Sequence, residues 1–427
     1  MTEPLPPRNP WWIPPFLGTV PPVDGRLLTL LGLVSLAIFF EQYDASMLTA
    51  ALKHIAFDLE IGEDRLGPFL AMIRLGALPA LFLVPFADRF GRRRIFLASV
   101  VGFSIGTMAS GFAQDAYQFV ALQMVTRIFM TVGTAVAVVI IAEEYPALHR
   151  GWAIGMMGAL SAAGQGLGAG LAAFIEVLPF GWRLLYAIGI APLLLLPGLR
   201  RNLVETDRFR QHMADVAGES APWYGPLRSL MIEFPRRTIL LGLVGFLFAV
   251  GELPVFQFSS YFVQTRHGWS TGQYSLMFIL GGTVGILGNI IAGRLGDRIG
   301  RRWVGCVFLG LFPVFAAVFY HGPSWMLPIA WSLFIFCSTA GGVIVRAMSG
   351  ELFPTSYRST AAAWLSFTIT LGWAVGLWTI GLHPAEESAD IATQISTIAA
   401  TVLLAGVLLL FVPETAGREL EAISEQR

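Results

Sequence analysis

Ionisable side chains inside the apolar stretches of this sequence are its strongest chemical signal. Three are carboxylates and three are guanidinium groups: Glu41, Asp44, Glu252, Arg74, Arg127 and Arg346. A charged group is costly within a lipid bilayer, so one that occurs there is by default a candidate for ion transfer, proton transfer or substrate contact. The chemistry to be expected is therefore proton movement and anion binding.

Asp44 and Arg127 form the predicted proton-coupling pair. Burial favours the neutral form of a carboxylate and a neighbouring Arg favours the charged form, so an acid held between these influences can take up and release a proton. Glu41 lies three residues before Asp44, on roughly the same helix face, and is the alternative titrating acid. A static ion pair that joins two helices is the other interpretation of Asp44 and Arg127.

Arg74 and Arg346 are the predicted substrate contacts. Arg74 lies about 14 Å from the outer end of its apolar stretch, near the middle of a bilayer, and a buried Arg without a protein partner favours a carboxylate ligand. Arg346 lies close to the cytoplasm, and extension of its side chain to the water there is the alternative. Other polar groups complete the candidate binding site: Gln42, Tyr43, Gln165 and Gln257. Because residues 256–261 offer one amide only, we expect a small organic acid rather than a sugar.

The elements that must position these groups are membrane-spanning helices. Hydrophobic residues make up 55% of the chain and charged residues 13%, whereas charged residues make up about 25% of soluble domains. A helix needs about 20 apolar residues to cross a bilayer. Suitable runs begin near residues 27, 66, 95, 117, 152, 182, 238, 272, 303, 325, 360 and 388. We therefore expect an all-α membrane protein with twelve transmembrane helices.

Two parts of the chain repeat one another. Asp88-Arg89-Phe90-Gly91-Arg92-Arg93-Arg94 returns 209 residues later as Asp297-Arg298-Ile299-Gly300-Arg301-Arg302-Trp303. At a shift of 208, Glu143-x-x-Pro146-x-x-x-Arg150 returns as Glu351-x-x-Pro354-x-x-x-Arg358. Glu205 likewise corresponds to Glu414. A duplicated unit of this length predicts two pseudo-symmetric six-helix bundles, an arrangement typical of secondary transporters.

The repeat also pairs Asp44 with Glu252, which lies in the first span of the second bundle. Glu252 is therefore a candidate for proton coupling or substrate contact, and a solvated position in an outer cavity is the alternative. Pro254 follows closely and is expected to break the helix locally. Discontinuous helices commonly form the binding sites of transporters.

The basic residues indicate how the chain is oriented. With the N-terminus inside, cytoplasmic segments hold 21 of the 28 Lys and Arg residues, and an excess of these residues in loops sets the cytoplasmic side. Both termini are therefore expected in the cytoplasm. The predicted parts are a Pro-rich N-terminus, a first bundle, a linker, a second bundle and a C-terminus, over residues 1–26, 27–200, 201–237, 238–412 and 413–427.

Acids and arginines gather where predicted spans end at the cytoplasmic surface. Carboxylates next to guanidinium groups form charge-assisted, often bidentate pairs. We expect a network of such pairs to hold the cytoplasmic side shut and to break when it opens, whereas topology anchoring alone is the alternative. Its predicted members include two turn glycines: Asp88, Arg89, Gly91, Arg92, Arg93, Glu143, Arg150, Glu205, Asp297, Arg298, Gly300, Arg301, Glu351, Arg358 and Glu414.

These loops resemble the signature of the major facilitator superfamily, G-x-L-(A/G)-D-R-x-G-R-(R/K). The second copy, residues 293–302, matches throughout, and the first copy has Val84 where the family has its leading Gly. The strings around Glu143 and Glu351 resemble the sugar-porter and the aromatic-acid or metabolite:proton symporter branches. The resemblance implies a twelve-helix fold and, in proton-coupled relatives, an Asp of the first helix paired with an Arg of the fourth.

Other classes of protein find little support in the sequence. The histidines are scattered, and Cys306 and Cys337 both fall within apolar runs, so we expect no metal, no cofactor and no enzyme activity. The basic residues border predicted spans, which argues against nucleic-acid binding. A nucleotide-binding string G-x-x-x-x-G-K-(S/T) is absent from the sequence, which argues against ATP-driven pumping.

The function that the sequence favours is secondary transport of a small organic acid or related metabolite with protons, by alternating access in the inner membrane. Its partners are then the solute, protons and the lipid bilayer, and the chain is expected to act as a monomer. Efflux of drugs or metabolites by proton antiport is the alternative. A membrane sensor that transports nothing is a more remote one.

Overall fold

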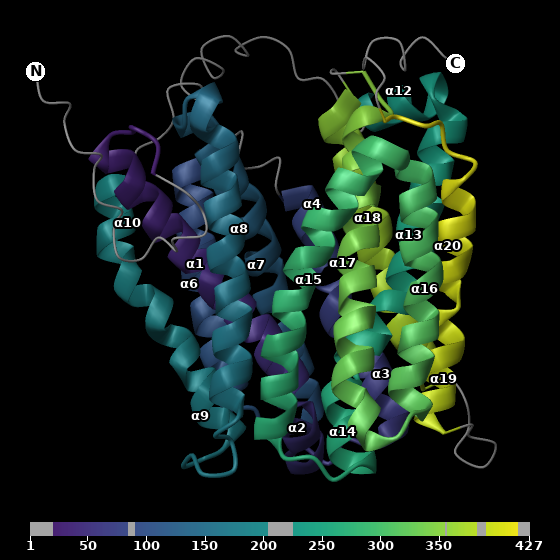
Figure 1. The fold of residues 1–427 in the computed structure, drawn as a ribbon. Helices are drawn as coiled ribbons and strands as arrows, with labels where there is room; N and C mark the ends of the chain where they lie inside the picture. Colours follow the sequence, from purple (N-terminus) through teal and green to yellow (C-terminus); the bar gives the residue numbers. More distant parts are fainter. Residues whose placement is uncertain (1–19, 84–89, 204–224, 355–356, 382–389, 417–427) are drawn as a thin grey trace, which may run out of the picture.

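The computed structural model describes residues 20–83, 90–203, 225–354, 357–381 and 390–416. Within these ranges the chain is helical and contains no strand. In Figure 1, α1 and α6 to α10 stand on the left and α13 to α20 stand towards the right. α4 lies near the middle, and α3 lies among the right-hand helices, against α18. We call these groups the first and second halves, with α2, α3 and α4 counted in the first.

The first half begins with α1, which Asp24 caps by accepting a hydrogen bond from the Arg26 amide at 3.4 Å. Several helices are interrupted. Ala51 separates α1 from α2, and Gly76 separates α3 from α4. The helices are α1 (Gly25–Ala50), α2 (Leu52–Asp58), α3 (Glu63–Leu75), α4 (Ala77–Leu83), α6 (Arg92–Ser110), α7 (Ala116–Glu144), α8 (Ala147–Ala172), α9 (Trp182–Ala187), η2 (Ile188–Leu195) and α10 (Leu196–Asn202).

The second half contains the break expected near Pro254. The helix ends at Gln257, and another begins at Ser259. Ser270 and Gln273 form a capping box at the start of α15, which satisfies two backbone N–H groups. The helices are α12 (Gly225–Glu233), α13 (Pro235–Gln257), α14 (Ser259–Arg266), α15 (Thr271–Ile299), α16 (Arg301–His321), η3 (Ser324–Met326), α17 (Leu327–Glu351), α18 (Arg358–Thr379), α19 (Ile391–Ala399) and α20 (Thr401–Leu409).

Nine helical segments in the described ranges are long and apolar enough to cross a membrane. The predicted runs near residues 66, 95 and 152 correspond to α3 with α4, to α6 and to α8, which are not among the nine. The break at Gly76 leaves α3 only 13 residues long, and α6 begins with three arginines. The nine segments are residues 25–50, 116–144, 182–202, 235–266, 271–299, 301–321, 324–351, 358–379 and 391–409.

The two halves pack their helices in the same way. α1 lies against α8, and α13 lies against α18. Gly164 of α8 faces the Phe39 carbonyl, and Gly372, 208 residues later, faces the Phe246 carbonyl. Glycine is needed at these points because a Cβ would strike the backbone of the facing helix, as is common where membrane helices approach closely. The sequence repeat is thus matched by repeated helix contacts.

The halves meet mainly at one end of the molecule, the lower end in Figure 1, where α2 and α14 lie side by side. Four hydrogen bonds there join them. Ser260 Oγ and Gln264 Nε2 donate to the Ala50 carbonyl at 2.9 and 3.4 Å. Tyr261 Oη donates to Glu63 Oε1 at 2.7 Å, and Lys53 Nζ donates to the Gln264 carbonyl at 3.2 Å.

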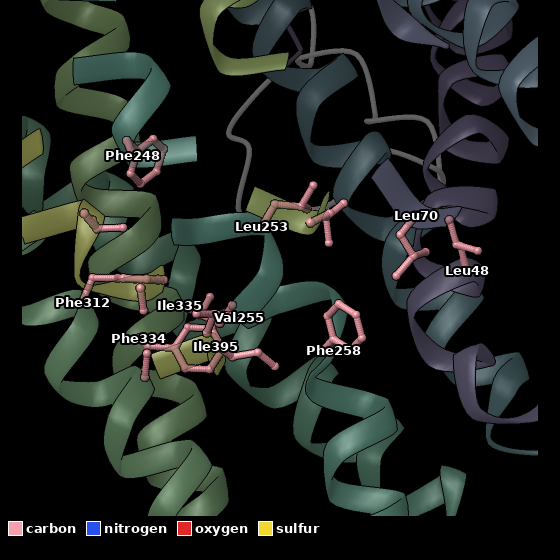
Figure 2. Packing of buried hydrophobic residues seen from close by; sticks show 14 of the residues in the cluster. Leu48, Leu70, Phe248, Leu253, Val255, Phe258, Phe312, Phe334, Ile335 and Ile395 are labelled. Carbon is pink, nitrogen blue, oxygen red and sulfur yellow. The ribbon is translucent and has the colours of Figure 1, made fainter. Parts of the chain in front are cut away.

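The buried apolar residues form two clusters. One contiguous cluster contains residues of both halves, and Figure 2 shows Leu48 and Leu70 of the first half in this cluster together with Leu253 and Phe258 of the second. A separate cluster lines the upper part of the first half and, in the described ranges, contains residues of that half only. The apolar core is therefore continuous between the halves at the lower end.

Gly67 of α3 is the position where a larger side chain should disturb this junction most. A Cβ there would strike the carbonyl oxygens of Leu377 and Ile380 at the end of α18. Overpacking costs roughly 1–3 kcal/mol, so Gly67→Val is expected to weaken the packing of α3 against α18 by about that amount. The temperature at which the purified protein unfolds should fall accordingly.

Gly158→Val in α8 is the matched control, because a Cβ at Gly158 meets no atom within 4 Å. It should unfold at the same temperature as the unmodified protein. Equal unfolding temperatures for both variants would show that the contact between α3 and α18 contributes little to stability.

Candidate functional site

A buried acid–base pair lies between α1 and α7. Asp44 is 1% exposed and Arg127 is 8% exposed. Arg127 Nη2 lies 3.9 Å from Asp44 Oδ2, and Thr107 Oγ1 donates a hydrogen bond to Asp44 Oδ1 at 3.1 Å. In the part of the chain that the structure describes, Asp44 Oδ2 has no hydrogen-bond partner. The ion pair is therefore longer than a direct charge-assisted hydrogen bond of about 2.7–2.9 Å, and one carboxylate oxygen is available for a proton.

Glu41 occupies a separate place on α1. It is 2% exposed, and Thr134 of α7 donates a hydrogen bond to its Oε2 atom. Its Oε1 atom has no hydrogen-bond partner among the described residues, and it faces Gly133. Glu41 and Asp44 thus contact different residues of α7, and each has an unpartnered oxygen.

Arg74 of α3 reaches from the first half to the second. Its Nη2 atom donates to Gln257 Oε1 at 3.0 Å, and its guanidinium carbon lies 5.8 Å from the centre of the Trp373 ring. Gln257 is fully buried, and in the described ranges its Nε2 atom has no hydrogen-bond partner. Arg74 and Gln257 therefore bring a positive charge and an unused amide donor together beside an aromatic face.

Glu252 lies at the indole N–H of Trp373. Trp373 Nε1 donates to Glu252 Oε2 at 3.1 Å, and Ser338 Oγ donates to Glu252 Oε1 at 3.1 Å. Arg346 lies eight residues beyond Ser338 on α17 and is exposed, but its guanidinium folds back along the helix to Gly342. The structure thus groups Glu252 with Trp373 and Ser338, and Arg346 and Arg74 are the basic residues whose charges act on it.

The other predicted substrate contacts, Gln42, Gln165 and Tyr43, form hydrogen bonds within the first half. Gln165 Nε2 donates to Gln42 Oε1 at 2.9 Å and so joins α8 to α1. Tyr43 is 1% exposed, and its hydroxyl donates to the Leu185 carbonyl at 2.8 Å. Tyr43 therefore packs within the first half, where it holds α1 to α9.

The charged loops of the first half lie at the upper end, but only in part within the described ranges. Asp88, Arg89 and Glu205 lie outside them. Gly91 has φ of 100°, a conformation that favours glycine, and directly precedes α6. Arg92 Nη2 lies 3.0 Å from Glu143 Oε1, which ties α6 to α7. Arg93 donates to the Arg200 carbonyl at 2.8 Å, and Arg150 lies in the first turn of α8.

The second copy of these loops shows the corresponding pairs. Arg301 lies 3.2 Å from Asp297 and also forms an ion pair with Glu351. Arg298 is exposed and Arg358 begins α18. The ion pairs of Arg92 and of Arg301 join neighbouring helices of one half and so brace that half.

Glu414 binds the backbone of the second loop. It accepts hydrogen bonds from the backbone N–H groups of Arg301, Arg302, Thr415 and Ala416 at 2.9–3.2 Å. Gly300 has φ of 112°, and a Cβ there would lie 2.9 Å from Glu414 Oε2. Burial raises the pKa of Glu414, but the four N–H donors outweigh it and hold the pKa below its usual range. The carboxylate therefore caps α16 in its charged form.

A helical membrane protein with repeated helix packing, two copies of one charged loop and buried charges where its halves meet has the features of a secondary transporter. A family model described as Major Facilitator Superfamily matches residues 34–286 and 240–426. The chain therefore belongs to the major facilitator superfamily. It is a multi-pass membrane transporter rather than an enzyme.

Individual relatives agree with this family. The chain is 26% identical over 378 residues to a gallate transporter of Pseudomonas putida, which covers 81% of this chain and 82% of the relative. It is 24% identical over 436 residues to a niacin transporter of Acinetobacter baylyi, with 94% and 97% covered. The crystal structure of a D-xylose-proton symporter has the same fold, with a TM-score of 0.77, 19% identity and coverage of 92% and 100%.

Three residues that hydrogen-bond to the buried charges could not be identified from the sequence. Thr107, Thr134 and Ser338 are common residue types in membrane helices, and their spacing did not distinguish them. A usable signal existed for Trp373, because it lies 208 residues after Gln165. Both residues hydrogen-bond from the fifth helix of a repeat to the first helix of that repeat.

Proposed function

We propose that this protein carries small aromatic carboxylates together with protons. The observation that carries the proposal is Arg74, which lies between the halves with the unpartnered amide of Gln257 and the face of Trp373 beside it. A guanidinium and an amide donor suit a carboxylate, and an indole face suits a flat ring. The names of two relatives support this class, because gallate and niacin each carry a carboxylate on an aromatic ring.

Proton coupling is assigned to Asp44 with Arg127, with Glu41 as the rival acid. Protonation of Asp44 would release Arg127 from its ion pair and remove a buried negative charge. Such a change would alter the contact between α1 and α7. The long pair distance of 3.9 Å and the unpartnered Oδ2 atom support this assignment.

We propose that the protein works by alternating access and that this structure is the state open at its upper end. The lower end, where hydrogen bonds and apolar packing join the halves, would be the closed outer side, and the upper end would open to the cytoplasm. The first and second bundles, residues 27–200 and 238–412, would then rock about the site. When the upper end closes, the charged loops around Arg92 and Arg301 would exchange their present partners for partners in the other half.

The same proposal includes the membrane topology. Twelve spans, six in each bundle, follow from adding α3 with α4, α6 and α8 to the nine long apolar segments. Both termini would then face the cytoplasm of a bacterial cell, which agrees with the excess of Lys and Arg in the segments of the chain on that side. One chain supplies every residue of the proposed site, so we propose a monomer in the inner membrane.

Uptake by proteoliposomes tests the substrate class. With an imposed proton gradient, vesicles should accumulate benzoate or a hydroxybenzoate, and unlabelled aromatic acids should compete far better than D-xylose or benzamide, the neutral amide of benzoate. Competition by the amide equal to that of the acid would remove the role of Arg74 as a carboxylate contact. Efflux of cationic drugs coupled to proton entry, without uptake of acids, would replace the proposal by antiport.

A further inference from the structure

Glu252 is a carboxylate beside a site that is proposed to bind carboxylates, which calls for a physical reason. Its two oxygens accept hydrogen bonds from Trp373 and Ser338, both at 3.1 Å. No ion pair within 4 Å includes it in the described ranges, and Arg346 is the basic residue farther along α17. A charged group held in this way keeps further lone pairs available as acceptors.

Trp373 fixes the positions of the positive and the negative group. Arg74 lies 5.8 Å from the centre of the indole ring, and Glu252 receives the indole N–H at 3.1 Å. Both charged groups therefore lie beside the same indole ring. An aromatic acid that stacks on Trp373 with its carboxylate at Arg74 and Gln257 would bring a substituent of its ring near Glu252.

From this arrangement we infer that Glu252 accepts a hydrogen bond from a ring hydroxyl of the substrate and so selects hydroxylated aromatic acids. The inference rests on the proposed function. A hydrogen bond to a charged acceptor favours binding by roughly tenfold to a hundredfold. An analogue without the hydroxyl would leave the buried carboxylate facing a C–H group, and a second carboxylate on the ring would be repelled.

The test compares matched acids in proteoliposomes that contain the full-length protein. Half-saturating concentrations are measured for benzoate, 3-hydroxybenzoate, 4-hydroxybenzoate and 4-fluorobenzoate, since fluorine has nearly the size of a hydroxyl but donates no proton. One hydroxylated acid should bind at least about tenfold more tightly than benzoate and 4-fluorobenzoate. Glu252→Gln, which keeps the size of the side chain but removes its charge, should reduce that ratio by about tenfold.

Glu176→Gln is the matched control, because Glu176 is an exposed carboxylate between α8 and α9. It should keep the selectivity ratio of the unmodified protein. The comparison of hydroxylated and fluorinated acids needs no variant, so the inference remains testable if Glu252→Gln fails to fold.

The outcomes separate the inference from the proposed function. Uptake of all four acids with similar half-saturation, or equal weakening of all four by Glu252→Gln, would overturn the role of Glu252 and leave aromatic-acid transport in place. Uptake by Glu252→Gln without proton movement would also overturn it, by assigning Glu252 to coupling. Failure of the unmodified protein to take up any of the four acids would overturn both proposals.

Discussion

Asp44→Asn is expected to abolish proton-driven accumulation of the solute while leaving the protein folded. The amide keeps the size of the side chain and a hydrogen-bond acceptor for Thr107, but it cannot release or take up a proton. For symport of one proton with one monovalent anion, each pH unit of gradient supports about tenfold accumulation. The variant should equilibrate the solute across the membrane instead of concentrating it, as measured by uptake at an imposed gradient of two pH units.

The control for this prediction is Asp58→Asn at the lower end. Asp58 forms an ion pair of 2.8 Å with Arg183 and is 46% exposed, so its loss removes an exposed ion pair that contributes little. Glu41→Gln then distinguishes the two acids of α1. If Glu41→Gln equilibrates the solute and Asp44→Asn still concentrates it, Glu41 is the coupling acid and the assignment of Asp44 is wrong.

Arg74→Gln is expected to lower the initial rate of aromatic-acid uptake by a hundredfold or more. Truncating one member of a buried charged contact costs roughly 2–5 kcal/mol, because the substrate carboxylate then faces no positive charge. Arg74→Lys should restore uptake in part, since Lys keeps the charge but not the two parallel donors of Arg. Both rates are measured at a substrate concentration well below half-saturation.

Arg266→Gln is the control for Arg74. Arg266 pairs with Asp390 at 3.6 Å, and its side chain is 66% exposed at the lower end. Its replacement should leave uptake close to that of the unmodified protein. If Arg74→Gln also transports at that rate, the carboxylate is bound elsewhere and the site beside Trp373 is not the substrate site.

Position along the chain predicts which residues share a depth in the membrane. The repeat of 208 residues related Asp44 to Glu252, and a rise of 1.5 Å per residue placed Arg74 near the middle of its span. Family membership followed from the repeated loops that contain Arg92 and Arg301, and the family model confirmed it. These features depend on local sequence and on helix length, which the sequence states directly.

Contacts between helices could not be predicted in the same way. Whether Arg74 meets Asp44, Gln257 or a substrate depends on how α3 is rotated and on how the halves are placed. Hydrophobic periodicity leaves that rotation undefined, because lipid and protein interior are both apolar. The hydrogen bonds from Trp373 and Ser338 to Glu252 therefore required the structure, as did the packing of Tyr43 against Leu185.

The most direct test of the central claim is the pH outside proteoliposomes when an aromatic acid is added without any imposed gradient. At pH 7.5 the acid is an anion, so its entry together with protons should make the outside more alkaline. The change should saturate with substrate and should disappear in Asp44→Asn. Solute uptake of the same extent with no change in pH would contradict proton-coupled symport and make the protein a uniporter or an exchanger.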